Sequence, residues 1–197
     1  MQTSTILDIA QANGGVVTSA MVDAHGVSRG ILKHLTDAGR LERRARGVYY
    51  LPGISTDALF DLHVQYTRGI YSHGSALALL GLLDASALDD VPHMTFPAGY
   101  NTSGARARGL VAHVSKTGLH ELGVCEVDTP AGHRVRSYNA ERALCTVARL
   151  VNDPLMCSAF RRYEARPDAN PDVLARYAAL LRVEHHLRSY IRRLRMR

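Results

Sequence analysis

Apolar residues near the start of the chain recur at helical spacing, and glycine closes each group. Ile6, Ile9 and Ala10 lie on one face of a first predicted helix, because positions three and four apart share a helix face. Gly14-Gly15 is predicted to end that helix. Val16-Val17 then predicts a short strand. The chain is therefore expected to begin with a helix followed by a strand.

Two further helices are predicted before residue 40. Thr18 or Ser19 is a suitable N-cap for the first of them, and Gly26 accepts the left-handed conformation expected at its end. Ser28 is a suitable N-cap for the second helix. One face of this second helix is predicted to be buried and carries Ile31, Leu32, Leu35 and Ala38. The opposite face is polar and carries Arg29, Lys33 and Thr36.

A basic hairpin is predicted to follow these helices. Its strands are Leu41 and residues 48–51, and its tip lies at or near residues 43–47. The resulting order of elements is helix, strand, helix, turn, helix, hairpin. This is the order of a winged helix-turn-helix, so residues 1–52 are predicted to be a DNA-binding domain.

The rest of the chain has a mixed pattern after a linker at residues 53–56. Helical spacing predicts helices over residues 57–68, 75–83, 140–151, 154–166, 172–181 and 184–196. Short alternating runs predict strands over residues 93–97, 110–115, 124–127 and 134–138, and residues 98–104 predict a loop. The fold class is therefore expected to be α/β (α+β). The N-terminal winged helix-turn-helix would be followed by a C-terminal α/β effector domain over residues 57–197.

Composition narrows the class of partner. The chain has 197 residues and a formal net charge of +6, which favours an acidic partner such as DNA. Its three cysteines are too few for a disulfide framework. No secretory signal is visible, and no run approaches the roughly 18 apolar residues of a membrane span. A cytoplasmic protein without membrane contact is expected.

The predicted DNA contacts follow from charge and position. Arg29 and Lys33 would reach the major groove, where arginine can bind guanine through two hydrogen bonds. Ser28 and Thr18 would lie at helix N-termini, which suit backbone phosphates. The wing would contact phosphates or the minor groove through Arg40, Arg43, Arg44 and Arg46. The outer face of the last helix is also basic, and it either extends this footprint or is only solvated; it carries Arg188, Arg192, Arg193 and Arg195.

Several segments resemble one family. The N-terminal ones are Gly14-Gly15-Val16-Val17-Thr18, Gly26-Val27-Ser28, Gly39-Arg40-Leu41 and Arg46-Gly47-Val48-Tyr49. Together they resemble the winged helix of the AbiEi-type antitoxins. Two later segments resemble further motifs of that family, Ser72-His73-Gly74-Ser75-Ala76-Leu77 and Asn139-Ala140-Glu141-Arg142-Ala143-Leu144-Cys145. Ala143 stands where that family often has threonine.

The resemblance implies a bacterial antitoxin of a type IV toxin–antitoxin (abortive infection) system that also represses its own operon. It implies binding to inverted repeats in the protein's own promoter, as double-stranded DNA. It further implies a cognate nucleotidyltransferase-like toxin, which such antitoxins counter without necessarily contacting it. The sequence does not give the operator, the oligomeric state on DNA or the mode of toxin neutralisation.

The spacing of reactive residues along the chain does not predict an enzymatic site or a metal site. Gly74-Ser75 with Asp84 lacks the carboxylate pair that a nucleotidyltransferase uses to hold metal ions. His113, His120, Cys125 and His133 match no compact zinc pattern, so no metal ligand is predicted. No catalytic residue and no cofactor are predicted either. Glu141 and Arg142 are expected to form an ion pair that holds their helix to the sheet.

Two alternatives from other classes remain. The C-terminal domain could be an enzyme, either a nuclease or a phosphotransferase, with an unrecognised site. It could instead be a module that neutralises a toxin by direct contact.

Overall fold

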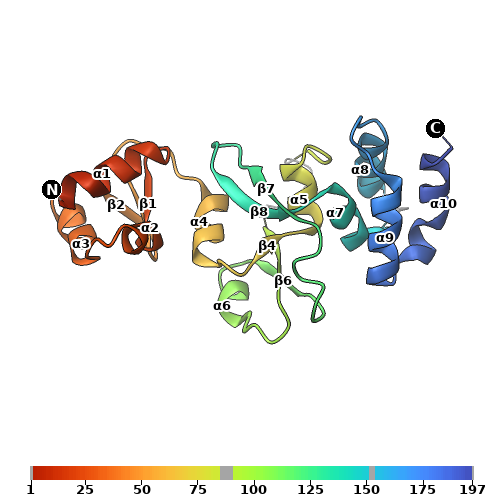
Figure 1. Cartoon of the computed structure of the whole chain (residues 1–197), viewed down its shortest axis with the longest axis horizontal. Helices are drawn as coiled ribbons and strands as arrows, with labels where there is room; N and C mark the ends of the chain where they lie inside the picture. The colour runs from red at the N-terminus through yellow and green to blue at the C-terminus, as the bar shows by residue number, and fades with distance from the viewer. Residues whose placement is uncertain (1, 85–90, 151–153, 197) are drawn as a thin grey trace. The chain divides into compact units, whose positions relative to one another are not determined.

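The structure is a computed structural model, and it describes residues 2–84, 91–150 and 154–196. The chain divides into two compact units, each described here by itself. The first unit comprises residues 1–67 and 128–134, and the second comprises residues 68–127 and 135–197. Figure 1 shows the elements of both units in chain order. The predicted mixed α/β fold class is confirmed.

The first unit begins with the elements that the apolar pattern predicts. They are α1 (Gln2–Ala12), β1 (Val16–Thr18), α2 (Ser19–Ala24), α3 (Gly30–Asp37), β2 (Glu42–Ala45) and β3 (Val48–Tyr50). The strands form an antiparallel sheet in the order β1-β3-β2, so the predicted pairing of β1 with the wing is confirmed. The helices enclose a small core that includes Ile6, Val22, Leu32, Leu35 and Leu41. Helix, strand, helix, helix and hairpin together make the winged helix.

The same unit continues past the predicted linker into α4 (Ala58–Gln65). Asp57 begins this helix as its N-cap, and its Oδ1 accepts a hydrogen bond from the Phe60 amide at 3.0 Å. The other carboxylate oxygen is bonded to the Thr129 hydroxyl and lies 2.9 Å from Nδ1 of His133. Asp57 is buried, and these bonds supply the partners that a buried carboxylate requires. They fix residues 128–134 within the first unit.

The second unit is built on a five-stranded sheet in the order β6-β5-β4-β8-β7. The strands are β4 (Ile70–Tyr71), β5 (His93–Phe96), β6 (Val111–Val114), β7 (Val124–Asp128) and β8 (Arg134–Tyr138). The tip of the hairpin that joins β7 to β8, residues 128–134, belongs to the first unit. β4 runs antiparallel to β5 and parallel to β8, and β5 runs parallel to β6. The four strands predicted from alternation are confirmed, whereas the two-residue strand β4 is too short to show a period.

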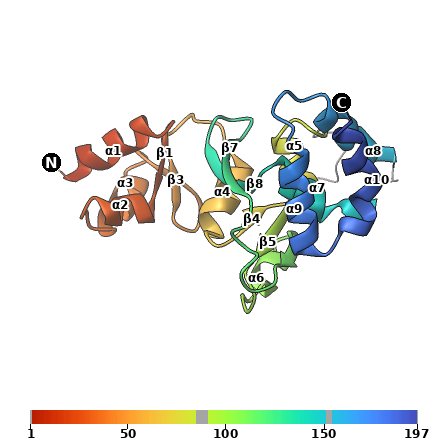
Figure 2. The same ribbon diagram turned by 45° about the vertical axis from the view of Figure 1, so that its right-hand side comes forward.

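Helices form most of the main core of the second unit. They are α5 (His73–Leu79), α6 (Ser103–Arg106), α7 (Ala140–Thr146), α8 (Pro154–Glu164), α9 (Pro171–Leu181) and α10 (Glu184–Leu194), with a 3₁₀ turn η2 (Ala148–Leu150). α5 and α6 pack against the sheet at β5 and β6. α7 packs against α5, α8 and α9, and α9 packs against α10. Figure 2 shows α8, α9 and α10 gathered beside α7. Phe160, Leu174 and Leu187 bring the C-terminal helices into one buried cluster with Leu144 of α7.

Several helix boundaries differ from those predicted, and α6 is a helix that the sequence did not predict. α5 ends at Leu79, because Gly81 adopts a left-handed φ of 70° and turns the chain back. α7 ends at Thr146, where the last turn tightens: the Val147 amide donates to the Leu144 carbonyl at 3.2 Å. The predicted end of that helix at residue 151 lies outside the described residues. α6 occupies part of the predicted loop over residues 98–104 and continues to Arg106.

The predicted ion pair between Glu141 and Arg142 is wrong. Both side chains are buried, but each has a different partner. The Tyr163 hydroxyl donates to Glu141 at 2.8 Å, while the Arg142 guanidinium lies over the Tyr138 ring, 4.4 Å from its centroid. Neighbouring residues on a helix point in directions about 100° apart, which sends these two side chains to different neighbours.

Candidate nucleic-acid interface

α3 separates an apolar face from a charged one, as its spacing predicts. Leu32 and Leu35 are each 1% exposed, and Ile31 packs at the edge of the same core. Lys33 is exposed on the other side and has no ion-pair partner within the described part of the chain. Ala38 was predicted to be buried, and this is wrong: it follows the helix as its C-cap and is exposed.

The N-terminus of α3 differs in detail from the prediction. The helix begins at Gly30, and Arg29 occupies the capping position in a helical conformation, one residue beyond the predicted cap at Ser28. Ser28 still caps the turn, because its hydroxyl accepts a hydrogen bond from the Gly30 amide at 3.3 Å. Ser28 and Arg29 are both exposed at this end of α3.

Arg29 is held by a neighbour on α2. Its Nε donates to Oδ1 of Asp23 at 2.7 Å, and a second guanidinium nitrogen is bonded to the other carboxylate oxygen. The side chains stay 67% and 43% exposed, so water and salt screen the pair. The Arg29 hydrogen bonds hold the pKa of Asp23 below its ordinary value. The pair orients Arg29 without burying it.

The wing carries its arginines along a strand as well as at its tip. Arg43 and Arg44 lie in β2, and the turn itself is formed by Arg46 and Gly47. This corrects the predicted tip at residues 43–47. Gly47 has a φ of 78°, a conformation that glycine adopts without strain, and this allows so short a turn.

A change of register separates the two strand arginines. The pairing of β2 with β3 shifts between Arg43 and Ala45, which marks an irregularity at Arg44. Arg44 is bonded to the carboxylate of Glu42. Arg43 and Arg46 are exposed and have no ion-pair partner within the described residues, and the same holds for Arg40 before the strand. The wing therefore presents three uncompensated cations and one compensated cation.

Thr18 connects α2 to the sheet and is not a surface residue. It is 4% exposed, and its hydroxyl accepts a hydrogen bond from the Met21 amide at 3.1 Å. The next amide, that of Ser19, donates to the Gly47 carbonyl at 2.9 Å. The N-terminus of α2 and the turn of the wing are thereby fixed to each other.

The last helix is amphipathic, as predicted. Its apolar residues Leu187, Tyr190, Ile191 and Leu194 are buried, each at most 9% exposed. Arg188 and Arg192 are exposed, whereas Arg195 is paired with Asp172 at 2.7 Å. The side chain of Arg193 lies outside the described side chains.

His133 and His120, considered from sequence as metal ligands, each have a hydrogen-bond partner within their own unit. His133 is bonded to Asp57 in the first unit, while Nε2 of His120 lies 3.1 Å from the Thr95 carbonyl in the second. Cys145 is buried, which raises the pKa of its thiol to about 12 and makes it a poor nucleophile.

Three histidines do come together in the second unit, among them His113, and the sequence analysis missed this group. His73, His93 and His113 have ring nitrogens within 4.8 Å of one another. Their spacing along the chain carries no signal, because strand pairing alone makes them neighbours.

Comparison with known proteins bears on the first unit most directly. Residues 4–52 match the family model of the AbiEi antitoxin transcriptional regulators, which confirms the resemblance over that segment. The match supports an antitoxin or regulatory role and favours a binding rather than an enzymatic function. Among curated proteins, none matches the chain.

One solved structure resembles most of the chain. The RV2827C protein from Mycobacterium tuberculosis is similar over 90% of this chain and 71% of its own, with a TM-score of 0.56 and 16% identity. At that identity the likeness shows a shared fold alone. Within the described residues no helix is long and apolar enough to cross a bilayer.

Proposed function

We propose that this protein is an antitoxin and a DNA-binding transcriptional repressor of its own operon. The observation that carries the proposal is the set of exposed cations without ion-pair partners on α3 and the wing, in a segment that matches the AbiEi regulators. Such cations can release counterions from DNA without first breaking a protein salt bridge.

The residues take different roles on the duplex. α3 enters the major groove, where Lys33 and Arg29 approach base edges. Arg40, Arg43 and Arg46 contact phosphates, and Arg44 joins them if it exchanges Glu42 for the backbone. Ser28 binds a phosphate at the start of α3. Thr18 acts indirectly, because its buried hydroxyl caps α2 and so positions the wing turn.

The partners follow from the same proposal. The DNA would be inverted repeats upstream of the protein's own gene, and the toxin a nucleotidyltransferase-like protein countered in a type IV system. The second unit would carry the neutralising activity. Arg188, Arg192 and Arg193 of α10 are candidates for an added contact to DNA.

A gel-shift titration tests the repressor role. The labelled duplex comes from immediately upstream of the gene and is compared with a scrambled duplex at two salt concentrations. We expect tighter, salt-sensitive binding to the upstream DNA. The variant Arg43→Ala/Arg46→Ala should bind both duplexes more weakly by the same factor. It should also lower the slope of log affinity against log salt by about 2, or about one unit for each lost phosphate contact.

The matched control removes the same charge elsewhere. Arg149 and Arg161 are exposed arginines of the second unit, and Arg149→Ala/Arg161→Ala should retain the wild-type affinity and salt slope. Unchanged binding by the wing variant would remove the wing from the interface. Equal weak binding of both duplexes by the wild-type protein would refute the repressor.

A further inference from the structure

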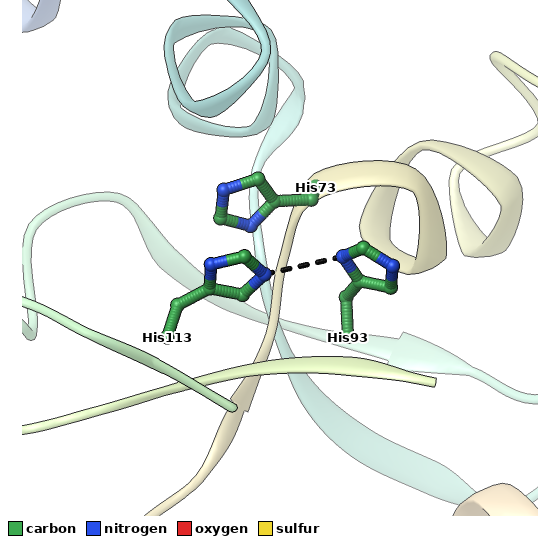
Figure 3. Close-up of side chains that lie close together, drawn as sticks. All are labelled: His73, His93 and His113. Carbon is green, nitrogen blue, oxygen red and sulfur yellow. Dashed lines mark hydrogen bonds between the residues drawn. The ribbon is translucent and has the colours of Figure 1, made fainter. Parts of the chain in front are cut away.

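Three histidines meet above the β4–β5–β6 part of the second unit's sheet. His73 begins α5, His93 begins β5 and His113 lies within β6. Figure 3 shows their rings facing one another. Nδ1 of His93 lies 3.2 Å from Nε2 of His113, and the rings of His73 and His113 are stacked with centroids 3.6 Å apart.

Strand register explains the meeting of the two strand histidines. β5 and β6 run parallel, with His93 opposite Val111 and Thr95 opposite His113. Residues two apart on a strand share a face, so His93, Thr95 and His113 point to the same side of the sheet. The two histidines are diagonal neighbours, which leaves room for their rings to approach each other.

His73 is brought to the same place by its neighbour Ser72. The Ser72 amide donates to the His93 carbonyl at 3.1 Å, and the Thr95 hydroxyl donates to Oγ of Ser72 at 2.8 Å. His73 itself has a φ of 52°, in the left-handed region that residues other than glycine rarely adopt. Such strain persists only where the surroundings fix it, and it gathers at functional sites.

The contact with Ser72 fits one tautomer of His73 that could bind a metal ion. Nδ1 of His73 lies 3.0 Å from the buried Ser72 hydroxyl, and Nε2 of that ring can bind a ligand in the tautomer whose proton is on Nδ1. Metal-binding histidines usually have their second nitrogen held in this manner.

A cavity of about 290 Å³ adjoins the cluster within the same unit. His73 and His113 line it together with Thr95, Ser115, Lys116 and Arg142. Arg142 is 4% exposed, and its Nε has no hydrogen-bond partner among the described residues. A buried donor without a partner is unfavourable, so this cavity is suited to a water molecule or an anion beside the histidines.

We propose that His73, His93 and His113 form a binding site for a zinc-class divalent metal ion. Imidazole nitrogens suit zinc, and ligands about 2.0–2.1 Å from a tetrahedral zinc lie roughly 3.3 Å apart. The 3.2 Å between His93 and His113 already fits that edge of the tetrahedron. To supply the third ligand, the stacked His73 ring must turn toward the other two, since the three ligand atoms lie within 4.8 Å of one another. The fourth position would hold water or an anion on the side of the cavity.

The experiment uses untagged full-length protein, stripped with chelator and titrated with zinc by calorimetry. We expect one zinc ion per chain. Cobalt(II), which substitutes for zinc, should produce the strong visible absorption of a tetrahedral ion with nitrogen ligands. His93→Asn and His113→Asn should each weaken zinc binding by at least about a hundredfold, beyond the roughly 10–100-fold expected on losing only an outer-shell partner.

The chain offers a matched control in His185 and His186 on α10. Their rings lie 3.9 Å apart, but they are adjacent in sequence and have no third histidine beside them. His185→Asn/His186→Asn should keep the wild-type zinc affinity and cobalt spectrum. Loss of binding in this control, with binding kept in the cluster variants, would overturn the site. The site would also be overturned if the wild-type protein bound no zinc, or if its cobalt spectrum were that of an octahedral ion. Neither of these two outcomes depends on how a variant folds.

Discussion

The winged helix and the histidine cluster hold their basic side chains in opposite ways. On α3 and the wing, Lys33, Arg43 and Arg46 are exposed and unpaired. In the second unit, His73 and His113 are half-buried, which lowers the pKa of both, and Arg142 is buried against an aromatic ring. The first group is solvated by water. The second group lost part or nearly all of its contact with water during folding.

The difference determines which ligand each region can take. Exposed cations attract a polyanion over a long range in a salt-dependent manner, and contacts to its phosphates need no exact geometry. Half-buried imidazoles held by their neighbours offer lone pairs at defined positions, which suits a small ion of defined coordination. The exposed surface of the winged helix should therefore tolerate changes of charge without loss of stability, whereas the interior of the second unit should not.

Cys145 gives the strongest test of how firmly the second unit excludes charge. Burial raises the pKa of its thiol to about 12 from an ordinary value near 9. At pH 8 this lowers the thiolate fraction by about a thousandfold, and only the thiolate is alkylated. Iodoacetamide labelling followed by peptide mass spectrometry should show slow modification in the native protein and fast modification in urea. Native labelling within tenfold of the unfolded rate would show that this interior admits charge.

Tyr163 tests a buried charge that the second unit does retain. Its hydroxyl donates to Glu141 at 2.8 Å and accepts from the backbone amide of Asn170 at 2.8 Å. The side chains of Tyr163 and Glu141 are both buried. Tyr163→Phe leaves the carboxylate and the amide unpaired, so the free energy of unfolding should fall by about 3 kcal/mol in urea denaturation.

The control for this change is Tyr100→Phe. The Tyr100 ring stacks on Phe96, and its hydroxyl has no hydrogen bond within the described part of the chain. Its removal should change the free energy of unfolding by well under about 1 kcal/mol. Equal effects of the two substitutions would mean that the Glu141 contact adds nothing.

The same contrast explains how much the sequence could predict. The winged helix is local: helix spacing and glycine stops give its elements, its buried Leu32 and Leu35, and the pairing of β1 with β3. The errors there are small, such as the start of α3 at Gly30 in place of a cap at Ser28. Short-range rules place an element well but leave its ends uncertain by a residue or two.

The histidine cluster is non-local, and the sequence could not give it. His73, His93 and His113 lie about twenty residues apart from one to the next, and only the pairing of β4, β5 and β6 joins them. A shift of one residue in that register would send a strand histidine to the opposite face. The Glu141–Arg142 pair failed for a related reason, because adjacency in sequence does not make two side chains partners in space.

Arg29 sharpens the contrast from the side of the winged helix. Arg29→Ala should reduce the preference for upstream over scrambled DNA by about tenfold or more, because a base contact carries sequence information and a phosphate contact does not. Thermal stability should not change, since Arg29 and Asp23 are both solvent-exposed. Competition gel shifts with both duplexes measure the ratio. A uniform loss on both would place Arg29 on the phosphate backbone.

Asp61 is the half-buried acid of the first unit, and it tests whether charge is tolerated there throughout. Burial raises its pKa above the ordinary value, although the Tyr50 hydroxyl donates to it at 2.7 Å. Because the pKa of Asp61 is higher in the folded state than its unfolded value of 3.8, the protonated acid favours the folded state. This stabilisation is fully present below pH 3.8, and it is lost as the pH rises through the folded pKa. Asp61→Asn resembles the protonated acid, so its stability relative to wild type should increase slightly between about pH 3 and pH 7. Urea unfolding at several pH values measures that difference. A variant that loses stability relative to wild type over this range would mean that the Tyr50 hydrogen bond to the charged carboxylate outweighs its burial, and that the first unit keeps a favourable charge below its surface.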